Sequence, residues 1–260
     1  MRIVSVGHAV FAATMIALGI LGFASGDFAA IWQPVPRGLP GREVLAGLCA
    51  LVALASGTAL LWRRTAAIAA RVLFGYLLLR MLLFKATSIF CAPLVEVSYE
   101  SCGETAVIVA GAWVMYALFA IERDQHWLGF ATGDRGVLSA RALYGLALIA
   151  FGLSHFAYAG ETAALVPAWL PAPMAWAYFF GGSYIAAGVA MLTGVRVRLA
   201  AALAAVQMGV FTLLVWVPAV LTGPDPSQWS EFVVSTTLTA GAWVMADACR
   251  GPPGLAVGRR

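Results

Sequence analysis

The chain contains eight apolar segments whose lengths approach or reach the thickness of a lipid bilayer. They fall at about residues 3–24, 44–62, 66–88, 104–121, 141–159, 173–193, 197–219 and 232–248. A helix needs roughly 20 apolar residues to span the hydrocarbon core. Only 11% of the residues are charged, whereas a soluble domain carries about 25%. Since backbone polar groups must be satisfied internally in lipid, the sequence predicts an all-α membrane protein of eight transmembrane helices.

The distribution of arginine predicts which helix ends face the cytoplasm. If the N-terminus is cytoplasmic, eleven arginines lie in cytoplasmic segments, and the opposite face carries only Arg37 and Arg42. The cytoplasmic set is Arg2, Arg63, Arg64, Arg123, Arg135, Arg141, Arg196, Arg198, Arg250, Arg259 and Arg260. Short cytoplasmic loops are enriched in Lys and Arg. We therefore predict that both termini are cytoplasmic, that the outer face is acidic, and that the protein lies in the inner (cytoplasmic) membrane as a multi-pass protein.

The first apolar segment could be mistaken for a secretory signal. It runs from Ile3 to about Ala24 after a single Arg2, which is longer than the 7–15 residues of a typical signal core. It also matches the fifth predicted helix. We therefore expect it to be retained as the first transmembrane helix.

The two halves of the chain repeat each other at a nearly constant spacing. Residues 110–115, with the sequence Ala-Gly-Ala-Trp-Val-Met, recur at 240–245. Other matches at similar spacing are Leu82-Leu83 with Leu213-Leu214, Pro93 with Pro224, Glu100 with Glu231, Gly57 with Gly188, and Gly19 with Gly152. The repeat predicts two tandem four-helix units, residues 1–121 and 141–250, joined by a cytoplasmic linker at 122–140 and followed by a cytoplasmic tail at 251–260. An even number of spans gives both units one orientation, so they should be related by an axis along the membrane normal.

Several short motifs of the second half together form a familiar pattern. They are Gly152-Leu153-Ser154-His155-Phe156, the loop Leu165–Pro171, the Gly181-Gly182-Ser183-Tyr184 run, and the turn with Arg196 and Arg198. This pattern resembles the DoxX-like superfamily of four-helix membrane proteins, directly in the second half and through the repeat in the first. The resemblance implies quinone-linked redox work, because some relatives are membrane subunits of thiosulfate:quinone oxidoreductases. The family often has an acidic residue before the Gly-Gly pair. Tyr178 and Phe179 occupy that neighbourhood here, so no role of that acid is carried over.

Charged residues at membrane depth usually face a cavity or a partner. Arg71 and Lys85 lie near opposite ends of the third predicted helix, where a long side chain can reach the interface, so we expect both to do so. Arg80 lies deeper. Two interpretations stay open for it: an ion pair with Glu104 or Glu43, or an anchor for a ligand oxygen or anion.

Other polar side chains at membrane depth extend the candidate ligand site. His155 lies about one turn inside the outer end of the fifth helix, on one helical stripe with Tyr144, Phe151 and Tyr158. It could donate to a quinone carbonyl, or it could pack and bond to a backbone carbonyl. Tyr76 and Gln207 are equivalent under the repeat, which suggests either a shared hydrogen-bonded centre or bonds between helices. The tentative ligand-binding set is Arg80, His155, Tyr158, Tyr76 and Gln207.

The cysteines and histidines limit the metal chemistry that the chain can support. Cys91 and Cys102 fall in one outer loop, where a disulfide is expected, with a reactive thiol pair as the alternative. No C-x-x-C occurs, which argues against a structural zinc site. His8 and His155 lie at different depths, and His126 lies in a loop. We therefore expect neither haem nor metal.

Three functions remain open from the sequence. The first is a membrane subunit of a redox system, such as a quinone-linked oxidoreductase, that binds quinone or quinol in the outer half and meets a periplasmic or membrane redox partner. The second is a non-catalytic anchor or scaffold for a periplasmic protein, suggested by the acidic, Trp- and Pro-rich outer face. The third is a small-solute transporter, suggested by the repeat but without interrupted helices in the sequence pattern. Only one basic residue is Lys and no basic run exceeds two residues, so we expect no nucleic-acid partner.

Overall fold

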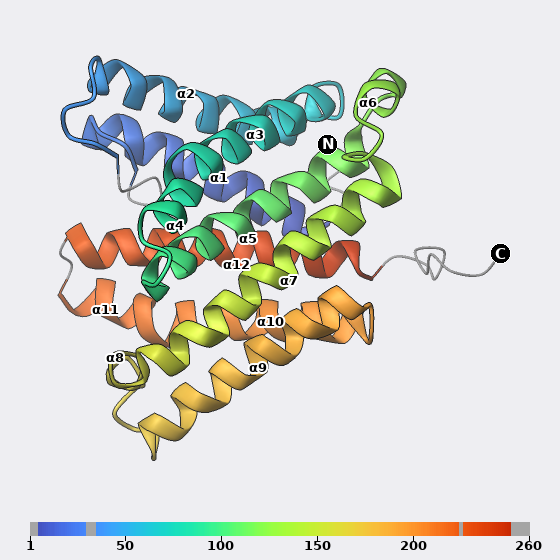
Figure 1. The fold of residues 1–260 in the computed structure, drawn as a ribbon. Coiled ribbons are helices and arrows are strands. Elements are labelled where there is room, and N and C mark those ends of the chain that lie inside the picture. Colours follow the sequence, from blue (N-terminus) through green and yellow to red (C-terminus); the bar gives the residue numbers. More distant parts are fainter. Residues whose placement is uncertain (1–4, 30–34, 224–225, 251–260) are drawn as a thin grey trace.

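The computed structural model describes residues 5–29, 35–223 and 226–250, and this part of the chain is helical without strands. Its uninterrupted long helices are α1 (Val6–Ser25), α2 (Arg42–Leu60), α5 (Glu96–Phe119), α7 (Gly133–Ala157), α9 (Pro173–Thr193) and α12 (Pro226–Ala248). Two short helices, α6 (Glu122–Trp127) and α8 (Ala159–Ala164), cap the ends of the bundle (Figure 1). Arg2, Pro224, and the predicted tail with Arg259 and Arg260 lie outside the described residues.

Two further long helices are each made of three consecutive segments. The first consists of α3 (Ala66–Arg80), the π-helical segment η2 (Met81–Ala86) and α4 (Thr87–Cys91). The second consists of α10 (Val197–Phe211), the π-helical segment η3 (Thr212–Trp216) and α11 (Val217–Thr222). The two π-helical segments begin at Met81 and Thr212, which are equivalent under the sequence repeat. Such segments are rare and often occur at functional sites.

Seven helices of the described chain are long and apolar enough to cross a membrane. They are α1, α2, the helix from α3 to α4, α5, α7, α9, and the helix from α10 to α11. The protein is therefore a multi-pass membrane protein. The eighth helix, α12, is rich in Ser and Thr and is not among the seven. A crossing by α12, and with it the count of eight, stays a prediction.

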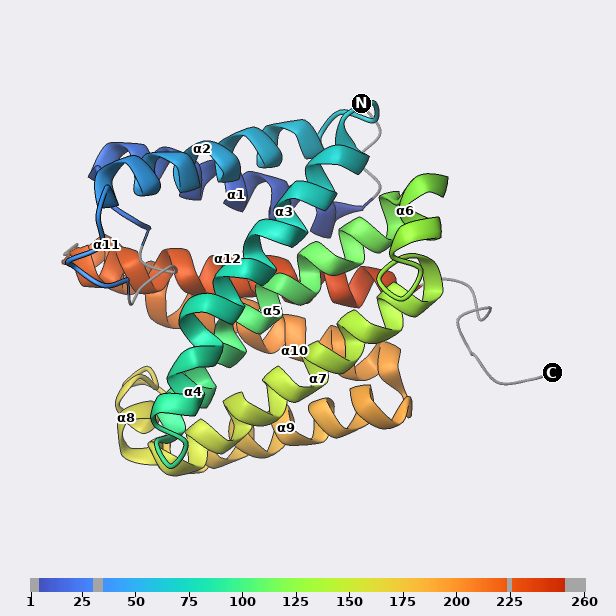
Figure 2. The same cartoon turned by 45° about the horizontal axis from the view of Figure 1, so that its top comes forward.

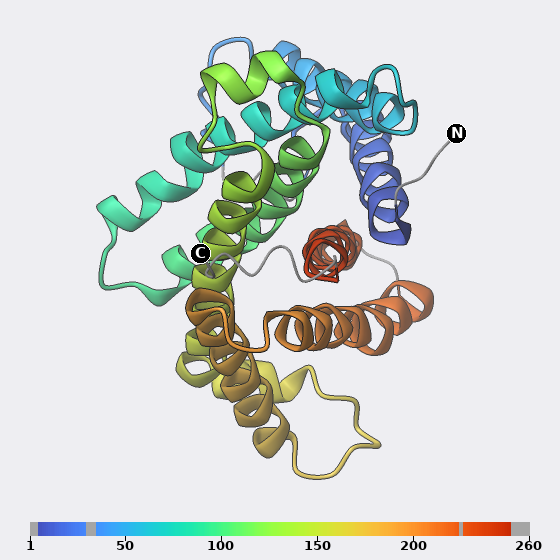
Figure 3. The same cartoon turned by 90° about the vertical axis from the view of Figure 1, so that its right-hand side faces the viewer.

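The helices α5 and α12 lie at the centre of the bundle. In Figure 3, α12 is seen end-on with α1 on one side, α5 on another and α10 below. Helix α5 contacts α3, α7 and α12, and α12 contacts α1, α5 and α10. Ser and Thr side chains of α12 are buried, as at Ser235 and Thr237. Its polar residues are therefore placed inside the protein instead of against lipid.

The same helix pairs recur in both halves of the chain. Within the first half α1 packs on α2, α2 on α3, and α3 on α5. Within the second half α7 packs on α9, α9 on α10, and α10 on α12 (Figures 1 and 2). Individual contacts recur as well: Gly57 packs against Ile16, and Gly188 packs against Ile149. These parallel contacts are what a tandem duplication predicts.

Several predicted boundaries differ from the observed ones. Helix α5 begins at Glu96, eight residues earlier than the predicted 104. Helix α7 begins at Gly133, so most of the predicted linker 122–140 is helical. The sequence analysis divided helices at charged residues. In the structure, α5 and α7 extend past those charged residues, so that Glu96, Glu100 and Asp134 lie on helices.

The described ends of the chain meet at one end of the bundle. The N–H of Gly7 at the start of α1 donates to Oδ2 of Asp247 at the end of α12, at 3.1 Å. The His8 ring bonds through Nε2 to the carbonyl of Leu60 at the end of α2, at 3.0 Å. This end therefore brings together the start of α1, the α2–α3 turn and the end of α12.

Candidate functional site

A cavity of about 640 Å³ opens in the second half, at the end of the bundle opposite the described termini. Its walls come from α5, α7, α9, α10, η3 and α12, and the segment from α8 to the Trp169 loop lies over it. Aromatic side chains, including Phe151, Trp176 and Phe180, form much of the lining. Ligand pockets typically enclose about 300–1,000 Å³ with mostly apolar walls. The size and lining of this cavity fit a small amphipathic molecule.

Carboxylates form the polar part of this cavity. Glu100 and Glu104 come from α5, and Glu231 comes from α12. Oε1 of Glu100 accepts a hydrogen bond from Ser154 Oγ at 3.2 Å, which ties α5 to α7 at the cavity wall. Acidic side chains within a membrane bundle usually mark a functional site. The cavity is therefore suited to ligands that donate hydrogen bonds or carry positive charge.

His155 lines the cavity, and its hydrogen bond defines its tautomer. Its Nδ1 lies 2.7 Å from the carbonyl oxygen of Phe151, one turn earlier on α7. A carbonyl can only accept, so Nδ1 carries the proton and donates. The Nε2 of a neutral ring then keeps a lone pair that can accept. The ring also meets the edge of Tyr184, with centroids 5.4 Å apart. The bond to Phe151 agrees with the interpretation of His155 as a packed histidine bonded to a backbone carbonyl, and a role in quinone binding stays a prediction.

Of the remaining tentative ligand residues, Tyr158 and Gln207 line the cavity. Oε1 of Gln207 on α10 accepts from Ser183 Oγ on α9, and its Nε2 makes a long bond of 3.4 Å to the carbonyl of Phe180. Tyr76 does not line the cavity. The sequence analysis suggested a shared centre for Tyr76 and Gln207. The structure places them in separate clusters, and Gln207 links the second helix of its own half to the third.

Arg80 is also absent from the cavity lining. It is buried, with 7% of its surface exposed. Its Nη1 donates to Cys49 Sγ at 3.0 Å, and its guanidinium lies 5.1 Å from the ring centroid of Phe28 and 5.8 Å from that of Tyr76. Among the described ion pairs, none joins Arg80 to Glu104 or Glu43. The structure therefore does not bring Arg80 and His155 together.

The sequence repeat relates the surroundings of Arg80 to the cavity. Residues 131 positions after Cys49, Tyr76 and Arg80 are Phe180, Gln207 and Phe211, and all three of these line the cavity. In the first half this region is filled by the guanidinium of Arg80, which packs between aromatic rings. In the second half the equivalent residues surround the cavity.

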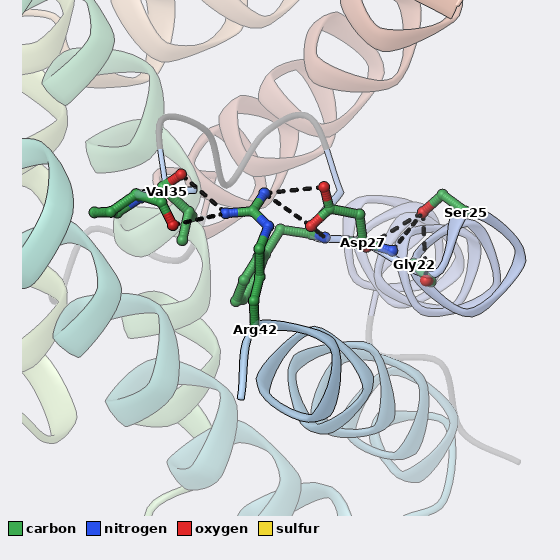
Figure 4. A network of polar contacts seen from close by, with 7 residues as sticks. Gly22, Ser25, Asp27, Val35 and Arg42 are labelled. Carbon is green, nitrogen blue, oxygen red and sulfur yellow. Dashed lines mark hydrogen bonds and ion pairs between the residues drawn. The ribbon is translucent and has the colours of Figure 1, made fainter. Parts of the chain in front are cut away.

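A group of contacts around Arg42, called the latch below, lies beside Arg80 and shares Phe28 with it. Nη2 of Arg42 pairs with Asp27, at 2.8 Å to Oδ1 and 2.9 Å to Oδ2, and its Nη1 donates to the carbonyls of Val35 and Pro36 (Figure 4). The Arg42 guanidinium also lies 5.3 Å from the centroid of Phe28. The Phe28 ring therefore contacts both Arg42 and Arg80, which is a cation–π arrangement. Arg42 beside Asp27 lowers the pKa of that carboxyl below its usual value.

The other two cations of the third predicted helix have partners on neighbouring helices. Lys85 is buried, and its Nζ donates to Ser101 Oγ of α5 at 2.6 Å. It also interacts electrostatically with Glu104. The expectation that Lys85 reaches the interface was wrong, because Lys85 lies on η2, which packs against α5. Arg71 is half-exposed and pairs with Asp124 of α6 at 2.6 Å.

The predicted bond between Cys91 and Cys102 is not formed in the structure, where both are free thiols. Cys91 is exposed at the end of α4. Cys102 is half-buried on α5, where it interacts with Lys85. The extension of α5 back to Glu96 places Cys102 within a helix instead of in the loop that the prediction assumed.

The sequence analysis missed the glutamates as cavity residues. It assigned Glu100 and Glu231 to outer loops, although it had matched them as a repeated pair. A usable signal was the spacing of Glu100 and Glu104 and of Glu231 and Ser235, each one turn apart, which predicts a common helix face.

Part of the second half of the chain matches a known family. Residues 136–217 match the model of the DoxX family. The matched residues, called the DoxX segment below, run from the start of α7 through η3 and contain His155, Tyr158 and Gln207. This match confirms the DoxX-like resemblance of the second half. The DoxX segment ends before α12, so Glu100, Glu104 and Glu231 lie outside it. No curated protein and no solved structure matches the chain.

Proposed function

We propose that the protein is a membrane subunit of a redox system that binds a quinone or quinol in the cavity of its second half. The cavity itself carries this proposal, because an anchor needs no enclosed pocket. Its volume of about 640 Å³ and its aromatic walls suit a substituted ring. The proposed membrane is the cytoplasmic one, and the proposed partner is a membrane or periplasmic redox protein.

The polar groups of the cavity favour the reduced form of such a ligand. A quinol carries two hydroxyl donors and needs acceptors. Nε2 of His155 and the carboxylate of Glu100 are acceptors at the cavity wall. For the oxidised form, the Gln207 amide can donate to a carbonyl, because its bond to Phe180 is long. When bound, this couple carries two electrons and two protons.

The test measures quinone that co-purifies with the protein. Wild type, His155→Ala and the matched control His8→Ala are purified in mild detergent, extracted and quantified by mass spectrometry. His8 is buried at the other end of the bundle and does not line the cavity. We expect His155→Ala to lower quinone content about tenfold, the equivalent of about 1.4 kcal/mol. His8→Ala should keep the wild-type content.

Two results would overturn this proposal. One is wild-type protein, gently purified, that carries no quinone and binds none on addition. The other is His155→Ala protein with the wild-type content. Either result would leave the non-catalytic anchor as the better interpretation.

A second candidate, small-solute transport, is favoured by the two π-helical segments. They interrupt equivalent helices of the two halves, and interrupted helices at corresponding positions often mark transport sites. Segment η3 also lines the cavity. Uptake of a labelled organic cation into proteoliposomes, compared with Glu231→Gln protein, would distinguish transport from quinone binding.

We also infer that the chain is a tandem duplication whose two ends face the cytoplasm. The recurring helix pairs and the matched π-helical segments support the duplication. The bond between Gly7 and Asp247 supports a common side for both ends, and the arginine distribution supports the cytoplasmic side.

A further inference from the structure

The end of the bundle opposite the cavity carries a shallow hollow lined mainly by arginine. Arg196, Arg198, Leu199, Ala202 and Arg250 line it. Arg196 and Arg198 lie at the turn between α9 and α10, and Arg250 follows the end of α12. Neither the DoxX segment match nor the proposed quinone site assigns a role to this hollow.

The charge of this hollow is mostly uncompensated. Arg250 pairs with Asp247 through Nη1 at a long 3.4 Å, and Asp247 is also used by the Gly7 N–H. Arg196 and Arg198 are exposed, and no described ion pair includes either of them. Of the three guanidinium groups at the hollow, only that of Arg250 is therefore paired with a carboxylate in the described ion pairs. Such a group is suited to a phosphate, which Arg can bind with two parallel hydrogen bonds.

The backbone at this turn adds to the positive potential. Arg196 precedes α10 with φ 47°, a left-handed conformation that is uncommon for a residue other than Gly. Its side chain makes no capping bond and is exposed. The first N–H groups of a helix lack partners within the helix and favour anions. Strained residues of this kind concentrate at functional sites.

An apolar stripe leads away from the hollow along α10. Leu199, Leu203, Val206 and Val210 are 50%, 57%, 60% and 40% exposed. Their spacing of three or four residues places them on one face of the helix. Because α10 belongs to a candidate membrane span, this face contacts lipid chains. A molecule with phosphate at the hollow and an acyl chain on the stripe would satisfy both surfaces.

We propose that Arg196, Arg198 and Arg250 bind the phosphate of an anionic phospholipid, whose acyl chain lies along the exposed stripe of α10. Basic pockets at the cytoplasmic ends of membrane helices bind such head groups. The arginine hollow does not depend on the proposed quinone cavity, since the two lie at opposite ends of the bundle. Only the far end of the stripe, at Val210, also lines the cavity.

The equivalent turn of the first half offers a matched control. Arg63 and Arg64 lie exposed at the turn between α2 and α3, at the same end of the bundle, but they do not line the hollow. The variants Arg196→Ala/Arg198→Ala and Arg63→Ala/Arg64→Ala remove the same charge. If only the first of these variants binds lipid more weakly, the loss is caused by the hollow and not by a general attraction of basic residues to a negatively charged membrane.

The test measures lipid binding to the full chain in detergent by native mass spectrometry and by thermal shift. Phosphatidylglycerol, phosphatidylcholine of equal chain length and inorganic phosphate are compared. We expect wild type to bind phosphatidylglycerol selectively. At about 1 kcal/mol for each Arg, the Arg196→Ala/Arg198→Ala variant should bind it roughly 30-fold more weakly. The Arg63→Ala/Arg64→Ala variant should bind it like wild type.

The other outcomes count against the proposal. Equal weakening in both double variants would show that the hollow has no special affinity. Equal binding of phosphatidylglycerol and phosphatidylcholine would show that head-group charge is not recognised. Stabilisation by inorganic phosphate as large as that by phosphatidylglycerol would overturn the lipid assignment. If Arg196→Ala/Arg198→Ala fails to fold, Arg250→Ala, after the end of α12, tests the same hollow and should also weaken binding.

Discussion

Gly111 of α5 packs directly against Gly241 of α12. A Cβ atom built on Gly111 would lie 2.9 Å from the Cα of Gly241, so the two backbones touch. The two residues are also equivalent in the sequence repeat, at an offset of 130. A contact between equivalent residues places them beside the axis that would relate the two halves.

The first prediction concerns this contact. Gly111→Ala should lower the free energy of unfolding of the purified protein by about 1–3 kcal/mol, and with it the melting temperature, because an added methyl group must push two backbones apart. Gly75→Ala is the matched control, since a Cβ on Gly75 meets no atom within 4 Å. It should leave the melting temperature unchanged or raise it. Equal melting temperatures for both variants would contradict the close packing of α5 and α12.

The close contact also shows what the sequence could and could not reveal. The Ala-Gly-Ala-Trp-Val-Met repeat predicted a duplicated helix, because identical residues recur at a constant offset. It could not show that the two copies touch each other, since periodicity describes one helix at a time. The contact became visible only when α5 and α12 were placed together.

The cavity illustrates the same limit. Hydropathy located the helices of the DoxX segment and gave His155, Tyr158 and Gln207 as candidates, and the structure places all three at the cavity. Arg80 was predicted to belong to the same site because it lies at a similar depth in the membrane. Depth along a helix does not fix the direction of a side chain, however, and Arg80 faces α2 and Phe28 instead.

The interruption of the second long helix has a cause that can be read from the sequence. Pro218 follows η3 and has no N–H to donate to the carbonyl of Leu214 one turn earlier. The first half has Thr87 at the equivalent position, and proline therefore does not explain η2. Pro218 lies one residue before the predicted end of this helix at 219, so the pattern predicted no interrupted helix.

The second prediction concerns the buried charges between η2 and α5. Lys85→Met should destabilise the protein by as much as about 3 kcal/mol, because it leaves Glu104 without its nearby positive charge. The double variant Lys85→Met/Glu104→Gln should recover part of this loss. Thermal unfolding of both single variants and the double variant gives the coupling energy. Strictly additive effects would show that the two side chains do not interact.

The third prediction concerns pH and the latch of the first half. Arg42 lowers the pKa of Asp27 in the folded protein. A carboxyl whose pKa is lowered by folding stabilises the fold above its ordinary pKa near about 4, and the stabilisation is lost as the pH falls through the lowered value. Wild type should therefore be more stable than Asp27→Asn at pH 7, by up to about 1 kcal/mol for such an exposed pair. The difference should shrink as the pH falls through the lowered pKa of Asp27. A difference that is constant with pH would contradict this role of the pair.

The last prediction uses two thiols at opposite ends of the bundle to test topology and reactivity together. Cys91 is exposed, and the arginine distribution predicts that its end of the bundle faces outward, so a membrane-impermeant maleimide added to spheroplasts should label it rapidly. Cys249, just after α12, is half-buried, and burial raises its pKa to about 11. The predicted topology places Cys249 on the cytoplasmic side, so the impermeant reagent should leave it unlabelled in sealed spheroplasts. Only the thiolate of a cysteine reacts. After permeabilisation Cys249 should therefore react slowly at pH 7 and faster as the pH rises.

Cys91→Ser and Cys249→Ser variants assign each labelling signal to its cysteine. Labelling of Cys249 but not of Cys91 in sealed spheroplasts would invert the topology. Labelling of Cys91 only after treatment with a reductant would show that the bond to Cys102 forms in the cell, contrary to the free thiols of the structure.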